Sequence, residues 1–350
     1  MKVGQQEEII KMGKYILKRL GYMVIVFFVL SFLMYLVYAL VPYDRARAEQ
    51  QKVKDAYKQD PAGYEQYYQD KRVELGLDQP LVIRYLGWLG LAPINGEYNG
   101  VLQGNFGWCY SENKTAISVL KEPMINTIFI NIFATALALG ISIPLGIFCA
   151  THRGSKRDTA IQTATIIGYG VPSFIFAMLF LLVFASILGW FPVGGMGTSG
   201  SDYTGFRKFI DKLYYMALPL IVMTVSSLGG MTRYVRASMT EALSMDCIRT
   251  ARAKGVREKV VIYSHAWRNA LVPILTLIIG WFIGIFGGSV MIENIFDLKG
   301  IGSKYVTALN AYDYEVVLLL QMFYVIVGLL GNLITDIVYG LADPRIRVNK

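Results

Sequence analysis

Six stretches of the chain carry no Asp, Glu, Lys or Arg, and they dominate its pattern of hydrophobic and polar positions. Each stretch is 20 to 43 residues long. About 20 apolar residues let a helix cross the roughly 30 Å hydrocarbon core of a bilayer. The stretches are Leu20–Tyr43, Pro123–His152, Thr159–Ser201, Leu213–Thr232, Asn269–Ile292 and Val316–Thr335. The pattern predicts an all-α polytopic membrane protein with six transmembrane helices.

The longest stretch is interpreted as one span followed by a loop. From Gly189 onward it is rich in Gly and Pro, which do not remain helical in contact with lipid. Inside the span, the sequence Gly168-Tyr-Gly-Val-Pro172 predicts a kink, because Pro172 cannot donate a helical hydrogen bond. Phe174 follows this kink and is a candidate packing or pore residue together with Pro172.

The distribution of charge predicts the topology. Basic residues prevail before the first span, in the loop after the second span and in residues 233–268, where eight Lys and Arg face three acids. Residues 43–122, in contrast, hold 10 basic and 11 acidic side chains. By the positive-inside rule both termini are cytoplasmic, and the net charge of +9 reflects topology without requiring a nucleic acid.

Four regions follow from this topology. Residues 1–43 form a cytoplasmic N-terminus and the first helix, and residues 44–122 form an extracytoplasmic cap, in which Arg45–Gln59 is expected to be helical up to a break at Asp60-Pro61. Residues 123–342 form a five-helix core that includes a cytoplasmic loop, 233–268, and residues 343–350 form a cytoplasmic tail. With 54% hydrophobic and 17% charged residues, and a mean hydropathy of +0.43, an ordinary soluble enzyme is excluded.

No chemistry of its own is evident in the chain. The sequence shows no P-loop, catalytic triad or metal-ligand cluster, and by the predicted topology no two of the three Cys share an oxidising compartment, which excludes a disulfide framework. No charged residue falls near the middle of a span, whereas ion-coupled pumps usually place Asp, Glu or His there. We therefore expect no catalytic residue, no bound cofactor and no metal, and an energy source outside this polypeptide.

The loop 233–268 contains the sharpest local pattern. Asp246 is expected to cap a short helix that ends at Lys254, and Gly255 fits the left-handed position after it. A second helix is expected from Arg257 to Trp267. Basic and apolar residues mix on the first helix, which suits docking into a partner's groove, and a solvated basic loop is an alternative that the pattern leaves open. The candidate coupling residues are Glu241, Asp246, Ile248, Arg249, Ala251, Arg252, Lys254 and Gly255.

In the fifth span, Gly280, Gly284 and Gly288 place one small residue on every turn. Such a stripe permits close contact between helices, and the same smooth surface can line a pore. Both interpretations remain open from the sequence.

Several ordered motifs resemble one family. Residues 248–255 read Ile-Arg-Thr-Ala-Arg-Ala-Lys-Gly, and 268–273 read Arg-Asn-Ala-Leu-Val-Pro. Together they resemble the cytoplasmic coupling loop, or EAA loop, of the permease subunits of dipeptide and oligopeptide ABC importers. The match extends to segments along most of the chain, including Leu75–Pro80, Ile143–Gly146, Val171–Phe174, Leu188–Gly194, Ile292–Phe296, Gly300–Gly302 and Asp343–Arg347.

The resemblance implies a type I ABC importer permease fold in a prokaryotic cell membrane, among membrane lipid. It also implies a second homologous permease subunit, two ATPase subunits that use ATP and Mg, and an extracytoplasmic peptide-binding protein. Two features depart from the family: Arg249 stands where the general EAA pattern has glutamate, and residues 45–73 form an insertion. Cargo other than peptide, namely nickel or glutathione, stays open, as do an ion-coupled secondary transporter and a receptor-type membrane protein.

Overall fold

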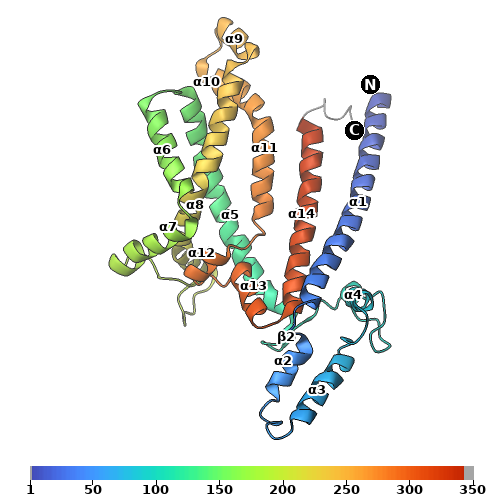
Figure 1. Cartoon of the computed structure of the whole chain (residues 1–350). Coiled ribbons are helices and arrows are strands. Elements are labelled where there is room, and N and C mark those ends of the chain that lie inside the picture. The colour runs from blue at the N-terminus through green and yellow to red at the C-terminus, as the bar shows by residue number, and fades with distance from the viewer. Residues whose placement is uncertain (1, 343–350) are drawn as a thin grey trace. The chain divides into compact units, whose positions relative to one another are not determined.

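Helices account for almost all of the regular structure in the computed structural model, which describes residues 2–342 (Figure 1). The predicted cytoplasmic tail, 343–350, with its Asp343–Arg347 motif, lies outside the described residues. Two compact units divide the chain. Of the described residues, the first unit contains those from Lys2 to Pro123 together with Lys304–Leu330, and the second contains Met124–Ser303 and those from Gly331 to Ala342.

The first unit combines one long helix with a group of short elements. Its elements are α1 (Lys2–Ala39), α2 (Arg45–Lys52), α3 (Pro61–Glu74), α4 (Leu81–Leu89), the 3₁₀ turn η1 (Val101–Gln103), strands β1 (Trp108–Cys109) and β2 (Lys114–Thr115), the first turns of α5 (Ala116–Thr151), most of α13 (Ile301–Asn310), and α14 (Tyr314–Ala342) as far as Leu330. The strands pair antiparallel, with Trp108 opposite Thr115.

The predicted insertion 45–73 forms a helical hairpin of α2 and most of α3. The expected helix over Arg45–Gln59 is wrong in its length, because α2 ends at Lys52. Asp60 and Pro61, expected to break a helix, instead begin α3: the Asp60 carboxylate accepts the Gly63 amide at 2.9 Å, and Pro61 fits the first helical position. Gln50 joins the two helices by donating to the Tyr64 carbonyl at 2.6 Å.

A buried carboxylate holds the strand pair beside α14. Asp313 is 1% exposed and accepts hydrogen bonds from the Tyr110 amide at 2.7 Å and from the Cys109 thiol at 3.2 Å. The hydroxyl of Ser111 also donates to Asp313. A buried carboxylate is stable only when donors surround it, so this arrangement fixes the loop that precedes α5.

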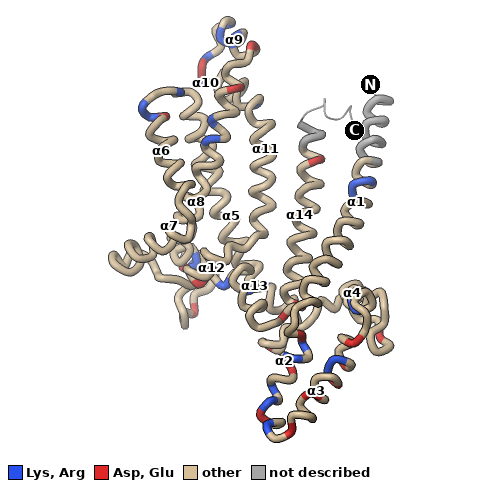
Figure 2. Tube along the Cα trace, viewed as in Figure 1, with Lys and Arg blue, Asp and Glu red and all other residues tan. Residues whose placement is uncertain are grey.

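The second unit is a bundle of long helices. Its elements are the rest of α5, α6 (Lys156–Gly170), α7 (Ser173–Phe180), the π-helical segment η2 (Leu181–Ile187), α8 (Gly205–Ser244), α9 (Asp246–Ala253), α10 (Glu258–Val260), the π-helical segment η3 (Val261–Ala266), α11 (Trp267–Gly284), α12 (Val290–Ile295), the start of α13 and the end of α14. Helix α8 packs against α6, α7 and α11. In Figure 2 the charged residues of this unit gather toward the ends of its helices.

Five helical runs in the described residues are long and apolar enough to span a membrane: Tyr15–Ala39, Ala116–Thr151, Gly205–Ser244, Glu258–Gly284 and Tyr314–Val338. The predicted third span is not one straight helix. Helix α6 forms its first part, and α7 together with η2 forms its second part. The two parts meet at an angle of 94°, at the kink predicted before Pro172. The prediction of six spans holds when this bent pair counts as one.

The fifth span is shorter than its charge-free window. Helix α11 ends at Gly284, and the chain has left the helix before Gly288, so the predicted extension to Ile292 is wrong. The absence of charged residues shows only where a span can lie. The pair Gly287-Gly288 disfavours helix inside this charge-free window, so the helix ends before the window does.

Candidate functional site

Helix α9 carries most of the predicted coupling residues at one end of the second unit, while Glu241 lies near the end of α8 and Lys254 and Gly255 follow α9 (Figure 1). The predicted capping by Asp246 is wrong. Met245, with extended backbone, occupies the N-cap position, and Asp246 is the first helical residue. Its carboxylate is 96% exposed, 3.4 Å from the guanidinium of Arg249. A carboxylate in the first turn still stabilises the helix, because it lies near the positive end of the helix dipole.

The two faces of α9 differ sharply. Ile248 is 0% and Ala251 is 9% exposed, because both pack into an apolar cluster with Met239 and Val261. These two side chains anchor the helix and do not face outward. The exposed members of the predicted set are Glu241, Asp246, Arg249, Arg252, Lys254 and Gly255.

The turn after α9 has the predicted geometry. Lys254 is the C-cap and Gly255 has φ +73°, which confirms its left-handed position. Arg252 braces this turn by donating to both carboxylate oxygens of Glu258, at 2.6 and 3.1 Å. Hydrogen bonding to Glu258 raises the pKa of the Arg252 guanidinium above its usual value.

The second predicted helix, Arg257–Trp267, is wrong at its end. Segments α10 and η3 run into α11, so that Glu258–Gly284 is one helical run. The apolar faces of Val261, Ala266 and Ala270 lie in the same cluster as Ile248. Packed side chains and a continuous helix therefore connect α9 to the fifth span.

A cavity of about 230 Å³ lies between α5, α8 and α11 of the same unit. Gly280, Trp281 and Gly284 line it from α11, and polar side chains of Asn131, Thr135 and Ser227 line it from the other two helices. A Cβ atom added at Gly280 or Gly284 would meet no atom within 4 Å. These two glycines are therefore not in tight helix contact within the chain, and they give the cavity its width.

The third predicted glycine has a different role. A Cβ atom on Gly288 would lie 2.4 Å from the Gly302 amide nitrogen, so a close approach of two backbone segments requires glycine here. Asn131 stabilises the break after α11 by donating to the carbonyls of Ile285 and Gly287, at 2.9 and 2.7 Å. The structure thus separates Gly288 from the cavity.

Glu293 lies just beyond this break and is 2% exposed. Burial raises the pKa of its carboxyl above the ordinary value, and hydrogen bonds from the Thr127 hydroxyl and the Ser303 amide, both at 2.9 Å, act in the opposite direction. It links α12 to α5 and to α13. Its position in the Ile292–Phe296 motif is the only sequence signal for it.

Pro172 and Phe174 lie away from the cavity. Pro172 is the exposed N-cap of α7, and Phe174 is half-buried on the first turn of that helix. Neither lines the cavity. The sequence interpretation missed Asn131, Thr135 and Ser227, whose signal was polarity inside otherwise apolar, charge-free stretches.

Comparison with known proteins gives the class. The chain is 37% identical over 273 residues, covering 77% of this chain and 82% of the relative, to the "Oligopeptide transport system permease protein AppB" of Bacillus subtilis (strain 168). It is 32% identical over 341 residues, covering 96% of this chain and 100% of the relative, to the "Probable peptide ABC transporter permease protein y4tP" of Sinorhizobium fredii. This is a multi-pass membrane permease, not an enzyme.

Residues 142–348 match the family described as "Binding-protein-dependent transport system inner membrane component". The chain belongs to this family, as its coupling-loop motifs predicted. Among solved structures, the MetNI methionine ABC transporter in an inward-facing conformation is similar, with a TM-score of 0.49 and 16% identity, covering 63% of this chain and 97% of that one. The predicted all-α permease fold is confirmed by the family match.

Proposed function

We propose that this chain is the permease subunit of an ATP-driven importer of short peptides in a prokaryotic cell membrane. The observation that carries the proposal is the sequence identity to permeases named for oligopeptide and peptide transport, over more than three quarters of the chain. The cavity between α5, α8 and α11 fits this role, because it lies among membrane-spanning helices and no charged residue lines it.

The chain forms half of the pathway in this proposal, beside a second homologous permease subunit. Two ATPase subunits bind ATP and Mg and dock on the cytoplasmic loop, and an extracytoplasmic binding protein delivers the peptide. The exposed charges of Arg249 and Lys254 on α9 are the contacts offered to an ATPase. The buried Ile248 couples α9 to the fifth span.

The cavity lining supports a cargo of variable sequence. The residues that surround it carry no charge, so a charged cargo side chain meets neither a counter-ion nor a like charge. The Thr135 hydroxyl and the acceptor oxygens of Asn131 and Ser227 suit the amides common to all peptides, while the Asn131 amide nitrogen and the Ser227 hydroxyl already donate to backbone carbonyls. Broad selection is then left to the binding protein.

Uptake into proteoliposomes tests the proposal. The complex of this chain with its permease and ATPase partners, supplied with its binding protein, is expected to take up a labelled tripeptide only when ATP is enclosed with the ATPases. Uptake should persist when an ionophore removes the proton gradient at constant ATP. Loss of uptake under the ionophore would overturn ATP coupling and favour an ion-coupled secondary transporter.

Competition identifies the cargo. Unlabelled peptides of graded length should reduce uptake of the labelled tripeptide, whereas nickel ions and glutathione at the same concentration should not. Transport of nickel or glutathione with no transport of peptide would leave the permease role intact and reject the peptide cargo. Purification in mild detergent provides an independent check, because an ATPase should be recovered with the chain.

A further inference from the structure

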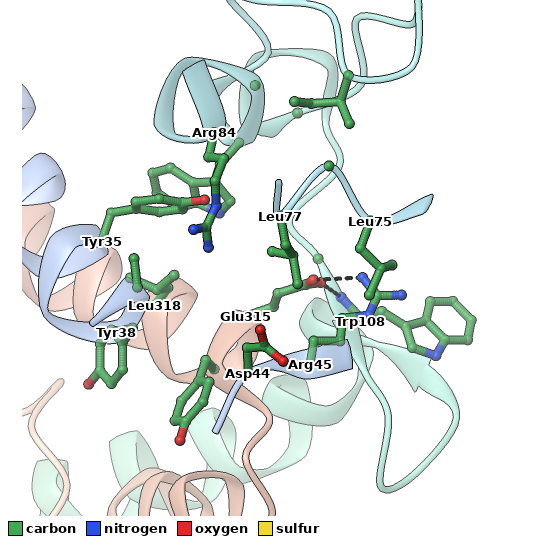
Figure 3. A pocket seen from close by; sticks show the side chains of 18 of the residues that line it. Tyr35, Tyr38, Asp44, Arg45, Leu75, Leu77, Arg84, Trp108, Glu315 and Leu318 are labelled. Carbon is green, nitrogen blue, oxygen red and sulfur yellow. Dashed lines mark hydrogen bonds and ion pairs between the residues drawn. The ribbon is translucent and has the colours of Figure 1, made fainter. Parts of the chain in front are cut away.

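A cavity of about 600 Å³ lies within the first unit and is separate from the transport cavity (Figure 3). The C-terminal end of α1, the N-terminal end of α14 and the segment from Leu75 to Tyr110 form its walls. Sites for small molecules have volumes of about 300 to 1,000 Å³ and largely apolar walls. The walls here contain the side chains of Tyr35, Leu75, Leu77, Trp88, Trp108 and Leu318.

Three of the charged groups in the cavity wall, namely Arg45, Glu315 and Asp44, already have partners. Arg45 lies 3.1 Å from the Glu315 carboxylate, and the other oxygen of Glu315 accepts the Trp108 amide at 2.6 Å. Asp44 caps α2 by accepting the Arg47 amide at 2.9 Å, and it also accepts the Tyr68 hydroxyl at 3.1 Å. These groups shape the wall without presenting an open charge.

Arg84 differs from these residues. In Figure 3 its guanidinium points from α4 into the cavity and lies beside the Tyr35 side chain. Within the described residues no carboxylate forms an ion pair with Arg84, and its Nε atom is buried without a hydrogen-bond acceptor. Arg84 is half-buried, and a positive charge that faces a largely apolar cavity without an anion favours the binding of an anionic ligand beside it.

The neighbouring residue holds Arg84 in this position. Tyr85 is 6% exposed, and its hydroxyl contacts the Ser31 hydroxyl at 2.6 Å and donates to the Phe28 carbonyl at 3.2 Å. Its ring packs edge-on against Phe32, at a centroid distance of 5.1 Å. Helix α4 is thereby fixed on α1, so packing alone sets the position from which the Arg84 side chain extends.

We propose that this cavity binds the C-terminal carboxylate of a short apolar peptide, with Arg84 as its counter-ion. The planar guanidinium matches a carboxylate with two parallel hydrogen bonds, and the aromatic and aliphatic walls take an apolar side chain. The single open positive charge selects a ligand with one negative group. The choice of a peptide among apolar carboxylates rests on the proposed function.

Calorimetric binding to the full complex in phosphatidylcholine nanodiscs, without ATP, tests this proposal. Trileucine and trileucine amide are the two probes, since they differ only in the terminal charge. We expect trileucine to bind at least about tenfold more tightly than its amide, as hydrogen bonds to a charged group allow. Equal affinities of the unaltered protein for the two probes would overturn the proposal without any variant.

Variants assign the binding to the cavity. Arg84→Gln should weaken trileucine binding about tenfold or more and remove the preference over the amide, and Arg84→Lys should retain part of it. Lys58→Gln, which removes a positive charge from an exposed pair elsewhere in the unit, should change neither affinity. Binding that survives Arg84→Gln but disappears in Gly284→Leu would belong to the transport cavity and would overturn the proposal.

Two further outcomes separate the alternatives. Loss of trileucine binding when phosphatidylglycerol replaces phosphatidylcholine would show that an anionic lipid occupies the cavity, which also overturns the proposal. If Arg84→Gln leaves trileucine binding unchanged while ATP-driven uptake persists, only this inference fails. If uptake needs an ion gradient but the Arg84-dependent binding remains, the proposed function fails and the carboxylate site stands.

Discussion

Asp158 and Arg236 form a bidentate ion pair in the second unit, with Arg236 Nε 2.8 Å from one carboxylate oxygen and its terminal nitrogen 2.7 Å from the other. Asp158 is 2% exposed, and the Gly154 amide donates to it at 3.0 Å. The pair joins the first turn of α6 to α8, whose last residues lead into α9. It therefore fixes the loop after α5 to the helix that carries the coupling segment.

Removing one partner of this pair should destabilise the protein. In Asp158→Ala the Arg236 side chain, only 27% exposed, would lose its counter-ion, at a cost of about 3 kcal/mol. The expected result is a clear fall in the midpoint of thermal unfolding in detergent. The double variant Asp158→Leu with Arg236→Met should recover much of the loss. Asp55→Ala, which breaks an exposed pair with Lys58, should leave the midpoint unchanged.

Gly255 offers a test of the coupling segment. Its φ of +73° suits glycine, and a Cβ atom there would meet no atom within 4 Å, so only backbone strain opposes substitution. Gly255→Val should cost about 1–2 kcal/mol locally, displace the turn after α9 and abolish ATP-driven uptake without preventing membrane insertion.

Two matched variants sharpen this test. Gly255→Asn should retain most uptake, because Asn tolerates the left-handed region. Gly200→Val places the same residue at an exposed glycine with φ +75° and open surroundings, and it should transport normally. Full uptake by Gly255→Val would show that the turn geometry does not contribute to coupling.

The sequence predicted features that depend on neighbouring residues. Charge-free stretches located every span, the run Gly168–Pro172 located the bend in the third, and Gly255 was identified as a helix-terminating glycine. Each depends on the composition or backbone preference of adjacent residues. Asp246 shows the limit, because local preference ranks Asp above Met at the N-cap, yet α9 begins one residue earlier with Met245 in that position.

Features made by distant residues were not predictable. Asp158 and Arg236 are 78 residues apart, and nothing in either local sequence indicates the partner. The glycine stripe shows the same limitation: Gly280 and Gly284 border a cavity, whereas Gly288 lies against another backbone segment. A small residue suits both situations, so only the fold distinguishes them.

The different surroundings of Gly284 and Gly288 predict opposite effects of substitution. Gly284→Leu projects into the cavity of about 230 Å³, so it should reduce peptide uptake severely with little change in the thermal midpoint. Gly288→Ala should lower the midpoint, because its Cβ atom would lie 2.4 Å from the Gly302 nitrogen. A large loss of stability in Gly284→Leu, measured by thermal unfolding in detergent, would show that the cavity closes in the complete transporter.

Maleimide labelling of the three cysteines tests both burial and topology. Cys247 is exposed on α9, whereas Cys109 and Cys149 are each 0% exposed. Burial also raises the pKa of the Cys109 thiol, so at pH 7.5 less of it is the reactive thiolate than of an ordinary cysteine.

A membrane-impermeant maleimide should therefore label native protein at Cys247 alone, and only when it reaches the cytoplasmic face in permeabilised cells or inverted vesicles. Cys247→Ser should abolish the labelling, while unfolding in detergent and denaturant should expose the other two thiols and restore it. Labelling of Cys247 in intact cells would place α9 on the extracytoplasmic side of the membrane. Because the ATPases are cytoplasmic in the proposed assembly, that single result would reject the assignment of α9 as their docking segment.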